Sequence, residues 1–493
     1  MEYEKYLESN KDQMISSLQE VLRFNSERGE KVVGEDGKVY PFGLGVQKAF
    51  ECTLNMAEEM GFVTKNVDNY GGHIDFPGTG KPILDKNGTV AGYEKPEVVG
   101  IIGHLDVVPA AGGWSFDPYG AEVKDGKIFG RGTSDDKGPV ISCLYAMKAL
   151  KDAGFKPQRT IRLIIGLDEE TKWEGMHYYF SKEEKPTFGF TPDADFPIIN
   201  GEMGIIVFEL AKKFIKSSGT GLELRSIKGG AAANSVADSC RTVVNSQTGE
   251  DYEKIKALAA AYRQDTGYKV YVKGIGKSLE ITTEGIGAHG AKPSSGLNAI
   301  SIMMDFLGRL NFINEDHNDF VSFYNENIGF CLDGEKIGMH FEDEPSGKLI
   351  FNVGLIEMDT ESGIITINVR YPVTCTAEQV YDSMSETLEK YNIGLIKGKA
   401  QAPIYKDLDN PMIKMLVDIY RKHSGDMESK PLVIGGGTYA RAADNIVAYG
   451  AFFPGDVDLM HQKDECLSIE RLEQMTSIYA EAIYKLASGE YNV

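Results

Sequence analysis

Acidic and imidazole side chains follow three apolar segments of this sequence. His104 and Asp106 end the segment EVVGIIGHLDVV, Glu169 and Glu170 end RTIRLIIGLDEE, and Asp193 follows FGFT. Carboxylates at the ends of buried strands are costly unless a cation neutralises them, and no cluster of Lys or Arg accompanies these. Histidine and carboxylate ligands suit zinc, manganese or cobalt. The pattern therefore predicts a divalent metal site.

A second motif, FGRGTSDDKGP at residues 129–139, places Asp135 just before an expected helix. Acidic residues there can simply cap the helix. The functional interpretation is that Asp135 bridges two metal ions, an arrangement that clamps a hydrolytic water. Of the eight histidines, His104, His289 and His461 lie in loops rich in Gly, Asp or Pro. His461 could supply the imidazole of the second metal.

The glycine run at residues 435–438, GGGT, lacks the spacing and the lysine of a phosphate-binding loop. A helix that begins after it would offer backbone N–H groups to an anion, so we expect a nest suited to a carboxylate. The sequence contains no GxSxG elbow, no HExxH helix and no dinucleotide-binding fingerprint.

The apolar segments predict the elements that position these residues. Residues 97–108, 159–170 and 188–201 are typical of buried strands, and helices are expected between them at 138–155 and 173–183. Strands that alternate with helices indicate an α/β layer with a parallel or mixed sheet. In such sheets, ligands bind at the carboxyl ends of the strands.

The pattern changes near residue 204. Five segments alternate apolar and polar residues, which is typical of half-exposed antiparallel strands: 204–214, 221–230, 278–287, 348–360 and 363–373. The α/β pattern resumes near residue 402. We therefore predict a catalytic α/β domain, residues 1–204 plus 402–493, with a mixed, mostly parallel sheet flanked by helices. A large α+β domain, residues 205–401, is inserted in it.

Composition narrows the function classes. A chain of 493 residues suits two or three domains, and its net charge of -21 disfavours nucleic acid as a partner. Six scattered cysteines without a CxxC pair indicate free thiols in a reducing compartment. No signal peptide and no apolar stretch of the ~20 residues that a membrane helix needs is present. We expect a cytoplasmic protein without a membrane role.

The motifs GHLDVVP, GRGTSDDKGP, LDEET, PDADFP and MHQKDE resemble, in this order, those of the metallopeptidase family of aminoacylases, carnosinases and bacterial dipeptidases. The similarity is greatest to its dipeptidase V subgroup, of Xaa-His dipeptidase type, and runs from about residue 95 to 470. It implies a cytoplasmic exopeptidase that hydrolyses dipeptides with two divalent metals. Zinc is the first expectation, with manganese or cobalt possible. The alternative is an N-acyl-amino-acid deacylase with the same metal site.

The same resemblance assigns roles to residues. One ion would be held by His104 and Asp193, the other by Glu170 and His461, and Asp135 would bridge them. Asp106 would orient His104. Glu169 would be the general base, and the peptide bond after Asp135 would be cis.

The inserted domain would be a two-lobed lid. The resemblance implies that its second lobe replaces a dimer partner, so that the chain is a monomer and His289 acts on its own active site. Asn234, Arg370 and the backbone near Gly436 would grip the carboxylate of a small peptide. The alanine-rich GGAAAN segment around Asn234 departs from the family pattern.

Overall fold

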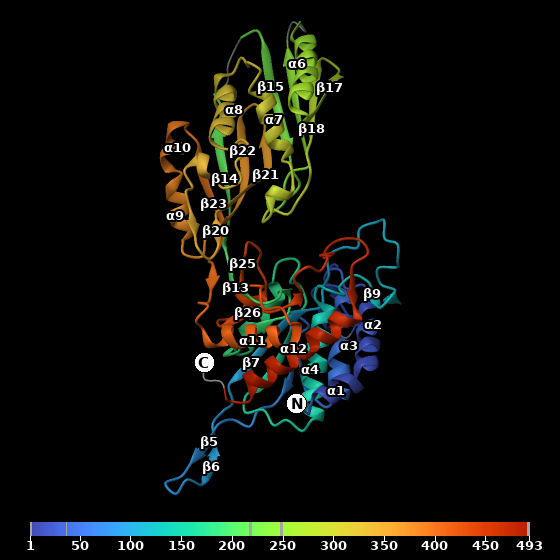
Figure 1. Ribbon diagram of the computed structural model, residues 1–493. Coiled ribbons are helices and arrows are strands. Elements are labelled where there is room, and N and C mark those ends of the chain that lie inside the picture. The colour runs from blue at the N-terminus through green and yellow to red at the C-terminus, as the bar shows by residue number, and fades with distance from the viewer. Residues whose placement is uncertain (1, 36, 216–218, 247–249, 491–493) are drawn as a thin grey trace. The chain divides into compact units, whose positions relative to one another are not determined.

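The computed structural model describes residues 2–35, 37–215, 219–246 and 250–490. The chain forms two compact units (Figure 1). The first comprises residues 1–200, 406–432 and 437–493, and the second comprises residues 201–405 and 433–436. The boundary between the two units passes through the glycine run. Gly435 and Gly436 belong to the second unit, and Gly437 belongs to the first.

A mixed sheet forms the centre of the first unit. Its strands lie in the order β13 (Ile199–Glu202), β26 (Ile446–Ala448), β11 (Phe188–Thr191), β7 (Val98–His104), β10 (Thr160–Gly166), β4 (Gly71–Phe76) and β3 (Val63–Val67). The four strands from β26 to β10 are parallel, and the outer pairs are antiparallel. Every residue of β7 is buried, as its continuous apolar sequence predicts. The short strands β24 (Ile404–Tyr405) and β25 (Leu432–Ile434) pair with β13.

Helices flank this sheet and confirm the predicted α/β class. They are α1 (Glu4–Ser9), α2 (Lys11–Leu22), α3 (Leu44–Glu59), α4 (Lys137–Asp152), α5 (Glu174–Lys182), α11 (Pro411–Ser424) and α12 (Ile469–Ala487). Helix α4 packs against α12 and β7, and most of its residues are buried. It begins directly after the aspartate pair of the second motif, so the sheet core fixes Asp135.

Small elements complete the first unit. Strands β8 (Glu122–Lys124), β9 (Lys127–Phe129) and β28 (Cys466–Ser468) form a separate sheet. A hairpin of β5 (Pro82–Leu84) and β6 (Val90–Tyr93) projects from the body (Figure 1). After the glycine run, the expected helix start is only a 3₁₀ turn, Tyr439–Arg441, capped by the side chain of Thr438.

The second unit contains an antiparallel eight-stranded sheet. Its order is β17 (Lys269–Ile275), β18 (Ser278–Glu284), β16 (Ser239–Ser246), β15 (Leu222–Gly229), β21 (Ile350–Met358), β22 (Ser362–Tyr371), β14 (Gly204–Lys213) and β23 (Gly394–Gln401). Strand β14 alternates buried and partly exposed residues, as predicted. The helices are α6 (Glu250–Thr266), α7 (Ala299–Leu307), α8 (Glu315–Asn327), α9 (Ala377–Ser383) and α10 (Ser385–Lys390). Among the described residues of both units, no helix has the length and apolarity to cross a bilayer.

Candidate metal centre

The carboxyl ends of three neighbouring parallel strands carry three of the five predicted ligands. His104 is the last residue of β7, and Gly166 beside it in the register ends β10, three residues before Glu169. Asp193 lies two residues after the end of β11 on the other side of β7. Because these ends meet at one edge of the sheet, segments distant in sequence deliver their acids to one place.

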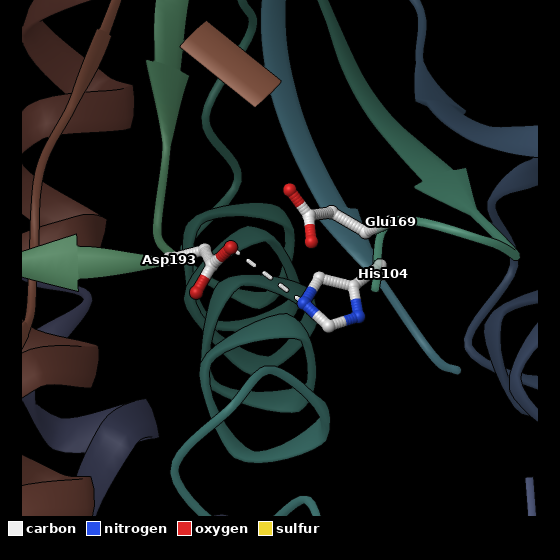
Figure 2. A group of neighbouring side chains, drawn as sticks. All are labelled: His104, Glu169 and Asp193. Atoms are coloured by element: carbon white, nitrogen blue, oxygen red, sulfur yellow. Dashed lines mark ion pairs between the residues drawn. The ribbon is translucent and has the colours of Figure 1, made fainter. Parts of the chain in front are cut away.

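His104, Glu169 and Asp193 form the first group of candidate ligands. Each offers one ligand atom, and these atoms all lie within 4.8 Å of one another. Nε2 of His104 lies 3.6 Å from Oδ2 of Asp193. Figure 2 shows both carboxylates facing the imidazole, which rises from β7. Glu169, expected to be a base, is therefore near enough to compete as a ligand.

Asp135, Glu170 and His461 form the second group, again within 4.8 Å. Nε2 of His461 lies 2.9 Å from Oδ2 of Asp135 and 3.1 Å from Oε1 of Glu170. The other oxygen of Asp135, Oδ1, lies 3.0 Å from Nε2 of His104. Asp135 therefore faces both groups, one oxygen to each. The peptide bond between Asp135 and Asp136 is cis.

The buried acids strongly perturb one another's proton affinity. Burial raises the pKa of Glu169 well above its usual value, and burial with the charge of Asp135 raises the pKa of Glu170 to about 7. Burial also opposes ionisation of Asp135, but hydrogen bonds with His104 and His461 outweigh it and lower its pKa. Hydrogen bonds to Asp135 and Glu170 raise the pKa of His461 to about 11.

The donor set fits a pair of divalent cations. Each group offers one imidazole nitrogen and two carboxylates, a combination that suits zinc or manganese. Nε2 of His104 is buried and faces carboxylate oxygens of Asp135 at 3.0 Å and of Asp193 at 3.6 Å. Its Nδ1 donates to the backbone carbonyl of Asp106 at 3.0 Å, which leaves Nε2 as the basic atom. A cation would bind that nitrogen and neutralise the neighbouring carboxylates.

The carboxylate of Asp106 contacts more than the histidine. Its Oδ1 lies 3.4 Å from Nδ1 of His104 and accepts the backbone N–H of Glu169 at 3.0 Å. Its Oδ2 accepts the N–H of Glu170 at 3.1 Å. One buried carboxylate therefore fixes the turn that presents both glutamates, a role that spacing alone did not indicate. The indole of Trp173 also holds this turn, by donating to the carbonyl of Glu169 at 2.9 Å.

The other predicted residues belong to the second unit: Asn234, His289, Arg370 and Gly436. The segments of Asn234, His289 and Gly436 adjoin one another there. The backbone N–H of Gly290 donates to the carbonyl of Asn234 at 2.7 Å, and Ser235 forms a β-bridge with His289. A methyl group added to Gly435 would lie 3.4 Å from Cβ of Ala291.

Arg370 also lies beside the glycine run. The methyl added to Gly435 would lie 3.5 Å from Cγ of Arg370, which is 5% exposed. Gly436 follows directly on Gly435. Asn352, which no sequence motif indicated, fixes the alanine-rich segment by donating to the carbonyls of Ala233 and Ser235, both at 3.0 Å. The second unit therefore gathers polar groups of the types that bind a carboxylate.

The sequence is similar to those of known proteins. The family model described as peptidase family M20/M25/M40 matches residues 100–485. A Staphylococcus aureus protein named "Putative dipeptidase SAB1611c" is 36% identical over 493 residues, covering 99% of this chain and 100% of the relative. "Putative dipeptidase YtjP" of Bacillus subtilis is 35% identical over 489 residues, with 99% and 100% coverage.

Solved structures share the fold. Human carnosine dipeptidase 1 aligns with a TM-score of 0.55 at 17% identity, covering 98% of each chain. Aminoacylhistidine dipeptidase from Vibrio alginolyticus aligns with a TM-score of 0.53 at 15% identity, covering 94% of this chain and 96% of that one.

Proposed function

This chain belongs to the peptidase family M20/M25/M40, and we propose the following function for it. It is a metal-dependent peptide hydrolase, and its substrates are dipeptides. The observation that carries this conclusion is the meeting of two ligand groups, with the carboxylate of Asp135 facing both. Related proteins named as dipeptidases match nearly the whole chain, which supports the substrate class.

We propose that two divalent ions, zinc in the first instance, occupy this centre. His104 and Asp193 would hold one ion, Glu170 and His461 the other, and Asp135 would bridge them. When bound, such a pair supplies Lewis acidity, which polarises the substrate carbonyl and brings the pKa of a water towards neutrality.

The protein's own groups then move the proton and hold the substrate. Glu169 accepts the proton of the attacking water and returns it to the leaving amine. His289 donates a hydrogen bond to the oxyanion, a contribution on the order of 3 kcal/mol. Arg370, Asn234 and the backbone near Gly436 bind the C-terminal carboxylate, for which a planar guanidinium is well suited.

We propose that the second unit is the lid that limits substrate length to small peptides. The edge strands of its sheet support a monomer, because β17 and β23 carry lysines that discourage pairing with another sheet: Lys269, Lys273, Lys397 and Lys399. All six cysteines are free thiols, which supports a reducing, cytoplasmic location.

A metal-reconstitution assay tests the function. We expect the purified protein to hydrolyse free dipeptides, to lose activity in a chelator, and to regain it when Zn²⁺, Mn²⁺ or Co²⁺ is restored. An N-acetylated copy of the same dipeptide should be a poor substrate. Equal or faster hydrolysis of N-acetyl-amino acids would instead identify a deacylase.

Replacing Asp106 with asparagine should weaken metal binding by about 10- to 100-fold, as is usual for partners that orient ligands. Asparagine keeps the size but offers only one acceptor to the N–H groups of Glu169 and Glu170, so their turn shifts. Equilibrium dialysis with Zn²⁺ measures the change. Asp359→Asn is the matched control, since Asp359 accepts two backbone N–H groups in the second unit. Undiminished affinity in Asp106→Asn would refute the orienting role.

A further inference from the structure

Glu465 is an acidic residue that the proposed chemistry does not use. It lies four residues after His461, and its side chain is only 1% exposed. An ionised carboxylate is costly to bury unless hydrogen bonds and an opposite charge compensate it. Oε2 accepts from Nη1 of Arg131 at 2.6 Å, and that guanidinium is itself buried.

The rest of the Glu465 carboxylate binds the loop that leads to Asp135. Oε1 accepts the backbone N–H of Ser134 at 2.9 Å, and the N–H of Gly132 lies 3.1 Å from both oxygens. Gly132 has φ +89°, a left-handed conformation that favours glycine and lets successive N–H groups turn to one side. Residues 131–134 therefore form an anion cradle, and Glu465 fills it.

The segment that carries His461 is held from outside by two partly exposed contacts: Asp464 accepts from the N–H and hydroxyl groups of Ser115, and Asp456 pairs with Arg471. Every residue from Pro454 to Asp464 is exposed or only partly buried, whereas Phe453 and Glu465 at its ends are buried. The side chain of His461 is itself 53% exposed. Beyond Glu465, Cys466 continues into β28, which pairs with β9 just before the cradle. Glu465 is thus the buried attachment nearest to His461.

We propose that Glu465 is a positioning residue for the second metal, a clasp that sets the distance between Asp135 and His461. The clasp joins the loop of one ligand to the loop of the other, 331 residues apart between Ser134 and Glu465. His104 and Asp193 stand on the ends of β7 and β11 and do not depend on it. This inference rests on the proposed two-metal function.

Glu465→Gln tests the clasp. Glutamine keeps the volume but turns an NH₂ group towards N–H donors, so the loop of His461 moves away while α4 still holds Asp135. We expect Zn²⁺ titration to show one ion bound with unchanged affinity and the other bound about 10- to 100-fold more weakly. Glu481→Gln is the matched control, because Glu481 on α12 is 5% exposed and paired with Lys422 and His423 of α11. It should bind both ions like the wild type.

A double-mutant cycle separates positioning from general stability. If Glu465 acts through His461, the variant His461→Ala/Glu465→Gln should bind Zn²⁺ no more weakly than His461→Ala alone. Additive losses, or equal weakening of both ions, would overturn the clasp. Should Glu465→Gln not fold, Arg131→Lys replaces it, with a smaller loss of the same ion expected and an unchanged titration counting against the clasp. A wild type that binds fewer than two Zn²⁺ would instead refute the proposed two-metal function.

Discussion

Glu169→Ala is expected to lower kcat on a free dipeptide by about 10³- to 10⁴-fold, near the upper end of what a general base contributes. The bound metal should stay at the wild-type stoichiometry. The reason is that Glu169 would move the proton of the attacking water, while other side chains hold the ions. Steady-state kinetics and metal analysis of the same dialysed sample measure both quantities.

The structure makes this experiment decisive, because Glu169 lies within ligand distance of His104 and Asp193. If Glu169 were a ligand, its removal would lower the number of metal ions bound per chain. Glu170→Ala is the matched comparison, since the two glutamates are adjacent and both backbone N–H groups bind Asp106. We expect Glu170→Ala to lose metal and Glu169→Ala to keep it. Loss of metal in Glu169→Ala would reassign that residue from base to ligand.

The strands of the metal centre could be predicted from the sequence, because a strand that is buried on both faces has a nearly continuous run of apolar residues. β7 and β10 are almost wholly apolar, so the acids that follow them stand out. The strands β16, β17 and β23 of the second unit went unpredicted. Strand β23, GLIKGKAQ, is an edge strand with exposed side chains, and its polar sequence does not differ from that of a loop.

Supporting residues were harder to predict than ligands. Asp106 shares a motif with His104, yet the backbone groups that it binds lie more than sixty residues away. Asn352 and Glu465 stabilise loops by binding backbone N–H or carbonyl groups, which carry no side-chain signature. The helix expected after the glycine run ended as one 3₁₀ turn, because Thr438 caps a segment that continues into β26 after a few residues.

Arg370→Ala is expected to reduce kcat/KM for free dipeptides by about 10²- to 10³-fold. Removing one member of a buried, charge-assisted pair costs about 2–5 kcal/mol, and each 1.4 kcal/mol corresponds to a factor of ten. The loss should fall mainly on KM, because under the proposed function the carboxylate would be bound both before and during the reaction. Arg370→Lys keeps the charge but loses the two-pronged geometry, so we expect an intermediate value.

A change in the substrate gives a more specific control than a change in the protein. A dipeptide amide has no C-terminal carboxylate, so the wild type should cleave it poorly and Arg370→Ala should cleave it no worse. Arg241→Ala, which removes an exposed guanidinium paired with Glu280 in the same unit, should leave both substrates unaffected. Thermal unfolding of each variant checks that the buried position tolerates the change. If the wild type hydrolyses the amide as fast as the acid, the terminal carboxylate is not what the second unit binds, and Arg370 must serve the fold of β22 instead.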